Sequence, residues 1–305
     1  MSEKQLLLKG LDGGNPLAFL AALGTLQAVS LTWLDRTPRL HWEVAGGAYR
    51  PVLTGMGDKN EDDLLAALLE QITALKDNPA FAFADDLAVA QDVFRRIAVQ
   101  AYVECAFRKR HTCDFIAAFG CDALADAKNR GILDTALRTM SGAGHQHFLG
   151  FMRTLMISTS VEHLRSCLFD KWNYNDPGPS MRWDPMDDRR YALRWKEPSG
   201  DPIRTVRGAN CLAIIGLTLL PTQPVGDALE TTGFTQIPRK GTFWTWPIWG
   251  NPASVDVARS LLALRELQEK TPPRHRLSAL GVIEVFRSQR ITQGKYRNFT
   301  TAVPV

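Results

Sequence analysis

The sequence predicts an α+β fold: a mainly helical N-terminal region, 1–175, followed by a smaller region, 176–305, with an antiparallel sheet and one or two helices. Apolar residues recur at helical spacing through most of the first region, whereas strand-like apolar runs dominate the second. The stretch from Asn173 to Pro179 is rich in Asn, Pro and Gly and cannot continue a helix. We therefore place the boundary between the two regions there.

The N-terminal region is expected to begin with a short strand from Leu6 to Lys9, followed by a helix. Asn15 is a good N-cap and Pro16 suits the first helical position. The nineteen residues from Pro16 to Leu34 carry no charge, which approaches the length that a membrane-spanning helix needs. Because polar residues interrupt this segment and no flanking positive cluster orients it, we predict a buried core helix instead.

The other elements follow from the same spacing rules. In the first region they are a strand from Leu40 to Val44, a helix that begins at Asn60 or Asp62 and stops at Asn78-Pro79, and a helical pattern from Asp85 to about Phe169 with breaks near Gly120, Gly131 and Ser141 to Gly144. In the second region they are strands at Tyr191 to Trp195, Cys211 to Leu220, Thr242 to Trp249 and Ser278 to Arg287, and a helix from Val255 to Lys270 that Ser254 caps.

The composition is that of an ordinary globular chain. Of the 305 residues, 45% are hydrophobic and 22% are charged, which excludes collagen-like, disulfide-scaffold and mostly disordered classes. The five cysteines form no C-x-x-C pair and are odd in number, so we expect a reducing compartment, the cytoplasm. Cys105, Cys113 and Cys121 recur at a spacing of eight, but no His or Cys stands at a usual zinc-ligand spacing. We therefore expect buried thiols, no metal site and no cofactor.

Charge is distributed unevenly along the chain. Residues 1–94 carry seven basic and thirteen acidic side chains, so residues 95–305 carry a net +10 within the overall +4. An excess of positive charge attracts polyanions, and the basic part of the chain therefore favours a nucleic-acid partner. A surface that its charges merely solvate is the alternative.

The strongest local charge signal is the C-terminal stretch 272–305, which holds six Arg or Lys residues and one acid, Glu284. Basic residues alternate there with aromatic and amide side chains, an arrangement in which guanidinium groups neutralise phosphates while rings stack on bases. The candidate nucleic-acid-binding residues of this stretch are Arg287, Arg290, Lys295, Tyr296, Arg297 and Asn298. A solvated edge with packed aromatic residues is the alternative.

A second basic set lies within the helical pattern of the first region and comprises Arg95, Arg96, Arg108, Lys109, Arg110 and His111, of which all but His111 are candidate nucleic-acid-binding residues. Roughly 12 residues, about three and a half helical turns, separate its two groups, so both are expected along one side of the same helix. Four residues between them are then expected to face the core: Val99, Tyr102, Val103 and Phe107. A solvated helix face without nucleic-acid contact fits this pattern equally well.

A catalytic alternative rests on the carboxylates of Asp184, Asp187 and Asp188, because paired carboxylates can hold magnesium for phosphodiester chemistry. Arg189 and Arg190 adjoin them, which favours ion pairing that orders a loop, and no further carboxylate run completes a two-metal set. No complete catalytic motif occurs elsewhere. We therefore expect a protein that is not an enzyme, with a metal-dependent nuclease or another phosphoryl-acting enzyme as the alternative.

Three stretches together carry a resemblance to a known family. They are Gly13 to Gly24 (GGNPLAFLAALG), Asp187 to Trp195 (DDRRYALRW) with Arg207 to Asn210 (RGAN), and Arg287 to Ile291 (RSQRI) with Gly294 to Phe299 (GKYRNF). These stretches resemble the beginning, middle and end of large-subunit-type proteins in type I-G (formerly I-U) CRISPR operons.

The resemblance implies a non-catalytic subunit of a Cascade-like, RNA-guided complex that surveys double-stranded DNA in antiviral defence. The chain is then either the large subunit or an accessory protein beside it. The implied partners are guide RNA, target double-stranded DNA, other CRISPR effector subunits and a helicase-nuclease recruited in trans. In such complexes base pairing reads the target, while protein reads the backbone and the short flanking motif, the PAM. By residue type, the groups expected to reach base edges are Arg189, Arg190, Arg207 and Asn210.

An interaction scaffold without nucleic-acid contact is the remaining alternative. Five of the eight tryptophans lie between Trp183 and Trp249. If Trp244, Trp246 or Trp249 is exposed, it would anchor a neighbouring subunit, because tryptophan is enriched at interface hot spots.

Overall fold

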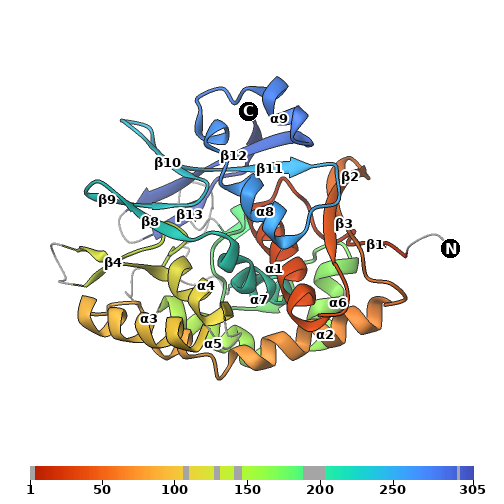
Figure 1. The fold of residues 1–305 in the computed structure, drawn as a ribbon. Coiled ribbons are helices and arrows are strands. Elements are labelled where there is room, and N and C mark those ends of the chain that lie inside the picture. The colour runs from red at the N-terminus through yellow and green to blue at the C-terminus, as the bar shows by residue number, and fades with distance from the viewer. Residues whose placement is uncertain (1–3, 106–109, 127–130, 141–145, 188–202, 294–295) are drawn as a thin grey trace.

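The structure, a computed structural model, describes residues 4–105, 110–126, 131–140, 146–187, 203–293 and 296–305. Helices account for 43% of the residues and antiparallel sheets for 26%. The helices lie in the N-terminal part of the chain and the sheets mostly in the C-terminal part. This confirms the predicted α+β class. Figure 1 shows the C-terminal sheet above helices α1 and α7, while α2, α3 and α5 lie below them.

Helix α1 (Pro16–Thr32) runs through the centre of the molecule (Figure 1). As predicted, Asn15 caps it, and the side-chain oxygen of Asn15 accepts hydrogen bonds from the amides of Leu17 and Ala18. Every residue from Pro16 to Val29 is buried, which explains the uniformly apolar sequence. Within the described part of the chain, no helix is long and apolar enough to cross a membrane.

Helix α7 (Arg207–Gly216) crosses α1 at close range. A Cβ atom on Gly24 of α1 would lie 1.8 Å from the carbonyl oxygen of Leu212, so only glycine permits this approach. The predicted strand from Cys211 to Leu220 is therefore wrong, because this run forms most of α7 and a following 3-10 turn, Leu217–Leu219. A run that is apolar on all sides fits a buried helix as well as a buried strand.

Two antiparallel sheets cover the central helices. The first has the order β1 (Leu6–Leu7), β3 (Ala48–Thr54) and β2 (Arg39–Ala45). The second has the order β10 (Phe234–Ile237), β11 (Gly241–Trp249), β12 (Val282–Gln293) and β13 (Tyr296–Phe299), and β14 (Val303–Pro304) also pairs with β12. The sequence pattern misses β3, whose Pro51 interrupts the strand signal.

The longest strand, β12, begins later than its pattern predicts. The sequence predicts a strand from Ser278, but helix α9 (Arg274–Ala279) still includes this residue and Gly281 follows with a φ of +83°. The strand then continues to Gln293, past the predicted end at Arg287. Helix α8 (Val255–Leu262) has the predicted Ser254 cap but stops short of Lys270, because a 3-10 turn at Arg265–Gln268 replaces its second half.

The remaining elements complete the two ends of the molecule. The helices are α2 (Glu61–Leu75), α3 (Gln91–Cys105), α4 (Arg110–Phe119), α5 (Phe148–Ser158) and α6 (Val161–Phe169), and 3-10 turns lie at Pro79–Ala82 and Pro185–Asp187. Paired short strands are β4 (Gly120–Ala125) with β5 (Ile132–Asp134), β6 (Asp176–Pro177) with β7 (Arg204–Thr205), and β8 (Thr222–Val225) with β9 (Ala228–Thr231).

An aromatic cluster joins α1 to both sheets. The ring of Phe19 lies 5.6–6.2 Å, between centroids, from Trp42 of β2 and from Trp244, Trp246 and Trp249 of β11. All four tryptophans are buried. The expectation that an exposed tryptophan of β11 anchors a neighbouring subunit is therefore wrong, and this cluster instead stabilises the core.

The cysteines follow their predicted role only in part. Cys167 and Cys211 are buried, whereas Cys105, Cys113 and Cys121 are half-buried, and all five are free thiols. Burial raises the pKa of Cys211 to about 12, so this thiol stays protonated at neutral pH.

Candidate nucleic-acid interface

The strongest candidate site lies where β12 and β13 leave the aromatic core. In this ladder Thr292 pairs with Arg297, and Arg290 precedes Thr292 by two positions on the same strand. Side chains alternate between faces, so Arg290 and Arg297 share one face of the sheet with the buried Ser288 and Trp244. The two arginines therefore extend the inner face of the sheet beyond its packed part.

A third arginine joins them from the loop after β5. Arg290 Nη2 donates to the main-chain carbonyl oxygen of Arg138 at 2.9 Å, and Arg297 Nη1 donates to the same oxygen at 3.4 Å. The Arg138 side chain forms an ion pair with Asp134 and donates to the carbonyl of Met140. We refer to Arg138, Arg290 and Arg297 as the arginine cluster.

The arginine cluster holds more positive charge than the carboxylates around it neutralise. Arg290 and Arg297 form no ion pair with any described residue, and Asp134 is already engaged by Arg138. Burial, followed by the charge of Arg297, lowers the pKa of Arg290 to about 10, against the opposite effect of Asp134. Arg290 nevertheless remains charged at neutral pH, and its Nε atom is buried without a partner among the described residues. The Nε atoms of Arg207 and Arg259 share this feature, so what distinguishes Arg290 is its single acceptor and its lack of a carboxylate partner among the described residues.

Arg287 has a different environment, although it lies on the same strand. Its guanidinium donates to Thr245 Oγ1 at 2.9 Å and to the carbonyls of Leu267, Glu269 and Lys270 at 2.7–3.1 Å. These are the orphan carbonyls at the end of the 3-10 turn. These contacts give Arg287 a structural role, and the expectation that it binds nucleic acid stays a prediction. Asn298 is likewise buried, on the opposite face of the ladder from the arginine cluster.

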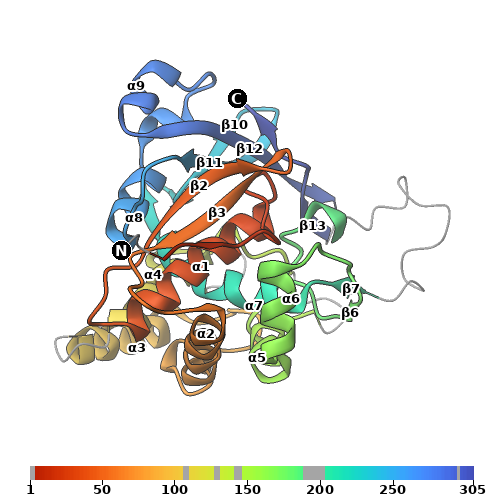
Figure 2. The ribbon, with the colours of Figure 1, turned by 90° about the vertical axis from the view of Figure 1, so that its right-hand side faces the viewer.

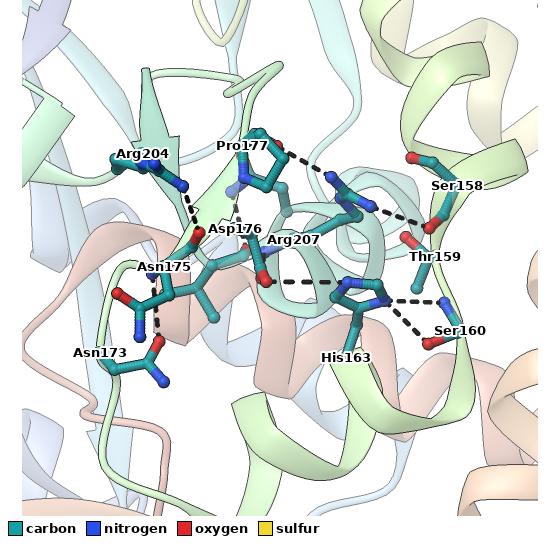
Figure 3. Close-up of polar contacts among 12 residues, drawn as sticks. Ser158, Thr159, Ser160, His163, Asn173, Asn175, Asp176, Pro177, Arg204 and Arg207 are labelled. Atoms are coloured by element: carbon teal, nitrogen blue, oxygen red, sulfur yellow. Dashed lines mark hydrogen bonds and ion pairs between the residues drawn. The ribbon is translucent and has the colours of Figure 1, made fainter. Parts of the chain in front are cut away.

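Arg207 also serves the fold. Figure 3 shows its guanidinium between the carbonyls of Ser158 and Pro177, at 3.2 and 3.0 Å, while its backbone amide donates to the carboxylate of Asp176 at 2.8 Å. That carboxylate lies at the positive end of the α7 dipole, which it stabilises. Arg204, at the start of β7, donates to the carbonyl of Asn175 at 2.8 Å (Figure 3), and Figure 2 shows β6 and β7 at the edge of the molecule.

A Ser-His-Asp arrangement lies beside Arg207 and was not evident from the sequence (Figure 3). His163 Nδ1 lies 2.9 Å from Ser160 Oγ and accepts from the Ser160 amide at 3.1 Å, while Nε2 lies 3.7 Å from Asp176. A serine, a histidine and an aspartate in successive contact resemble the catalytic triad of a hydrolase. Ser160 and His163 are, however, the N-cap and third residue of α6, so their contacts form a capping box that closes the first helical turn.

Asn210 is fully buried, so the expectation that it reaches base edges is wrong. Its side-chain oxygen accepts from the amide of Met181 at 2.9 Å, and its amide group donates to Thr205 Oγ1 and the Val206 carbonyl. The carbonyl of Met181 in turn accepts from Thr139 Oγ1 at 2.6 Å. Asn210 therefore connects the start of α7 to the chain immediately after Arg138, behind the arginine cluster.

The described residues of the second basic set do not lie on one continuous helix, because Arg95 belongs to α3 and Arg110 to α4. Arg95 pairs with Asp122 at 2.6 Å and Gln91 donates to the Asp122 carbonyl, so β4 folds back beside the start of α3. A continuous helix would separate these residues by about 40 Å. Arg110, at the start of α4, pairs with Asp114. Both arginines are thus neutralised by local carboxylates, whereas Arg96 is exposed without an ion pair to a described residue.

The apolar residues between the two groups are exposed, contrary to expectation. Val99, Tyr102 and Val103 are 56%, 75% and 57% exposed, and only Phe94 and Ala101 of α3 are buried. Seven predicted residues lie outside the described part of the chain, as do the side chain of Tyr296 and the predicted strand from Tyr191 to Trp195. The seven are Phe107, Arg108, Lys109, Asp188, Arg189, Arg190 and Lys295.

The acidic stretch serves as a structural junction. The buried carboxylate of Asp184 accepts from Asn15 Nδ2 at 3.1 Å, from the Tyr174 hydroxyl at 3.0 Å and from the Met186 amide at 2.9 Å. Burial raises its pKa, and Asp187 accepts from Ser180 Oγ at 2.5 Å. Among the described residues, no three His, Cys, Asp or Glu side chains are grouped to hold a metal ion. Both carboxylates thus serve as hydrogen-bond acceptors that order the loop.

Comparison of the sequence with models of known protein families and with curated proteins finds no match in either case. The resemblance to CRISPR large-subunit proteins therefore stays a prediction. The case for a function rests on the charge distribution and on the arginine cluster.

Proposed function

We propose that this protein is a non-catalytic, nucleic-acid-binding subunit of an RNA-guided CRISPR surveillance complex. It contacts guide RNA or target double-stranded DNA near the flanking motif, in the cytoplasm, beside other effector subunits. The helicase-nuclease would act in trans. In this role the chain supplies backbone affinity, and base pairing between guide and target supplies the sequence specificity.

One observation carries the proposal. Arg290 and Arg297 have no carboxylate partner among the described residues, whereas Arg95, Arg110 and Arg138 are each paired with an aspartate. Arg207 and Arg287 also lack a carboxylate partner among the described residues, but several main-chain carbonyls accept from them. Arg290 and Arg297 share a single carbonyl oxygen, and guanidinium donors left unsatisfied at a partly buried position favour an external anion. The excess of basic residues after position 94 supports a polyanion as that partner.

The test is co-expression of the tagged chain with its neighbouring genes and a repeat-spacer array, followed by purification and sequencing of any bound nucleic acid. The proposal predicts recovery of discrete guide-length RNA together with partner proteins. The matched control is the same chain expressed without the array, which should recover the partners but no guide-length RNA.

Recovery of the chain free of both RNA and partners would overturn the proposal. A second assay addresses the catalytic alternative directly. The purified chain, incubated with magnesium and labelled RNA or DNA, is expected to leave the substrate intact, and cleavage that Asp187→Asn abolishes would contradict a non-catalytic role.

A further inference from the structure

The arginine cluster contains an unusual convergence of donors. Arg290 reaches the Arg138 carbonyl oxygen from β12 and Arg297 reaches the same oxygen from β13. Two cationic groups on different strands therefore meet at one uncharged oxygen atom. Neither group has a carboxylate of its own among the described residues, and both side chains are only partly buried.

A single carbonyl oxygen satisfies little of what two guanidinium groups offer. Each guanidinium carries five N–H donors in a planar fork, and these donors prefer anionic oxygens in bidentate pairs. Like charges held together also repel each other in a partly desolvated site, which costs free energy until an anion arrives. The site is therefore arranged for an anionic group with several oxygens.

We propose that Arg290 and Arg297 together bind one phosphate group of a nucleic-acid backbone, beside the Arg138 carbonyl on which they converge. This inference rests on the proposed function and names the contact through which it acts. A phosphodiester offers two non-bridging oxygens on one atom, so each guanidinium takes one of them.

The surroundings favour a polymer of phosphates over an isolated carboxylate. The stretch 272–305 carries six basic residues against Glu284 alone, and Glu284 is paired with Arg274 at 2.7 Å. No base-reading group is needed at the arginine cluster, so the contact is independent of nucleotide sequence. The arginine cluster thus positions the strand, while other contacts or base pairing supply specificity.

The test uses the full-length purified chain and labelled single-stranded RNA of about 20 nucleotides and mixed sequence. The variants are Arg290→Gln, Arg297→Gln and the pair of substitutions together. Arg276→Gln is the matched control, because Arg276 is exposed on α9 in the same basic stretch and loses the same charge. Thermal unfolding of every variant establishes that it is folded.

We expect the double variant to bind about tenfold more weakly, or worse, since charge-assisted hydrogen bonds are lost. The slope of log K against log salt should flatten by about 0.7 for each phosphate released. Arg276→Gln should change the affinity by less than about twofold, as expected for an isolated surface charge.

A neutral-backbone probe separates the phosphate from other ligands. A DNA strand of the same length with methylphosphonate linkages should lose most of its affinity for the wild-type chain, because it lacks the charged oxygens. Competition by an acidic peptide as effective as that by the unmodified strand would overturn the phosphate assignment in favour of a protein ligand.

Failure of this inference differs from failure of the proposed function. If guide RNA is recovered from cells but the double variant binds RNA like Arg276→Gln, the arginine cluster is not the contact. If the double variant loses affinity for RNA but no guide RNA is recovered with partners, the phosphate site stands and the surveillance-complex function fails.

Discussion

Strand β12 passes through two environments, and two of its arginines show the difference. Both arginines pair with β11, but Arg287 lies beside the 3-10 turn, where four acceptors take its donors. Arg290, three positions later, has one hydrogen-bond acceptor and a buried Nε atom without a partner among the described residues. The donors of Arg287 therefore stabilise the fold, whereas most donors of Arg290 have no acceptor among the described residues.

The difference shows that charge counting alone does not locate a binding site. Both arginines belong to the same basic stretch and contribute equally to its net charge. What separates them is whether the protein itself supplies acceptors, because a satisfied arginine has little to gain from a ligand.

The largest effect is expected in the packed half of the sheet. Trp246 contacts Phe19 and Trp244, and its indole donates to the Gly13 carbonyl at 2.9 Å. Trp246→Ala should lower the free energy of unfolding by about 4 kcal/mol through the cavity it leaves. Urea denaturation measures this loss. A variant as stable as the wild type would show that β11 is not part of the core.

The second-largest effect on stability is expected at His111 of α4, a partly buried titratable group outside β12. Burial lowers the pKa of His111 to about 4 from its ordinary value of 6.5, against a smaller opposite effect of Asp114. As the pH falls, His111 therefore binds a proton in the unfolded chain at a higher pH than in the folded chain. The stability contributed by neutral His111 is complete above pH 6.5 and is lost as the pH falls towards 4, by about 3 kcal/mol in total.

Unfolding free energies measured across this pH range in the wild type and in His111→Phe check this expectation. The phenyl ring keeps the stacking on Phe115, whose centroid lies 4.8 Å away, but cannot bind a proton. The difference between the two proteins should change with pH below 6.5. A pH-independent difference would contradict the assignment.

A smaller loss of stability is expected when Arg287 is replaced. Arg287→Met should leave the carbonyls of Leu267, Glu269 and Lys270 without this donor and lower the free energy of unfolding by about 1–2 kcal/mol. RNA affinity of the folded protein should stay within about twofold of the wild type, as for a charge outside the contact. If the variant is fully stable yet binds RNA poorly, the roles assigned to Arg287 and Arg290 are reversed.

The smallest stability effect is expected at Arg290. Arg290→Met removes a partly buried charge that faces Arg138 and Arg297, so the free energy of unfolding should stay within about 0.5 kcal/mol or rise. Denaturant titration alongside Arg287→Met gives the comparison directly. A loss as large as that of Arg287→Met would indicate that the fold depends on the Arg290 hydrogen bond to Arg138.

Much of the fold follows from local sequence signals. The cap of α1 at Asn15, the caps of α2 and α8, and strands β2 and β11 all lie where the pattern predicts them. These signals are local because each depends on a few neighbouring residues. Helix α7 escapes prediction because contact with α1, distant in the sequence, buries it on every side.

The candidate site is predictable only in part. Net charge points to Arg290 and Arg297, but it points equally to Arg287, Arg207 and the pairs around Arg95. Long-range acceptors decide which of these are satisfied, and the sequence does not show them. The contribution of Arg138 is a main-chain carbonyl, which no side-chain pattern reveals.

Hydrogen–deuterium exchange of the full-length chain, with and without bound single-stranded RNA, measures whether β12 has a structural half and a binding half. RNA is expected to slow exchange of the backbone amides in 289–293, 296–299 and 137–140, around the arginine cluster, while residues 282–287 and their partners 245–249 of β11 exchange as before. Equal protection along the whole of β12, or protection confined to α3 and α4, would contradict the division of this strand into a structural half and a binding half.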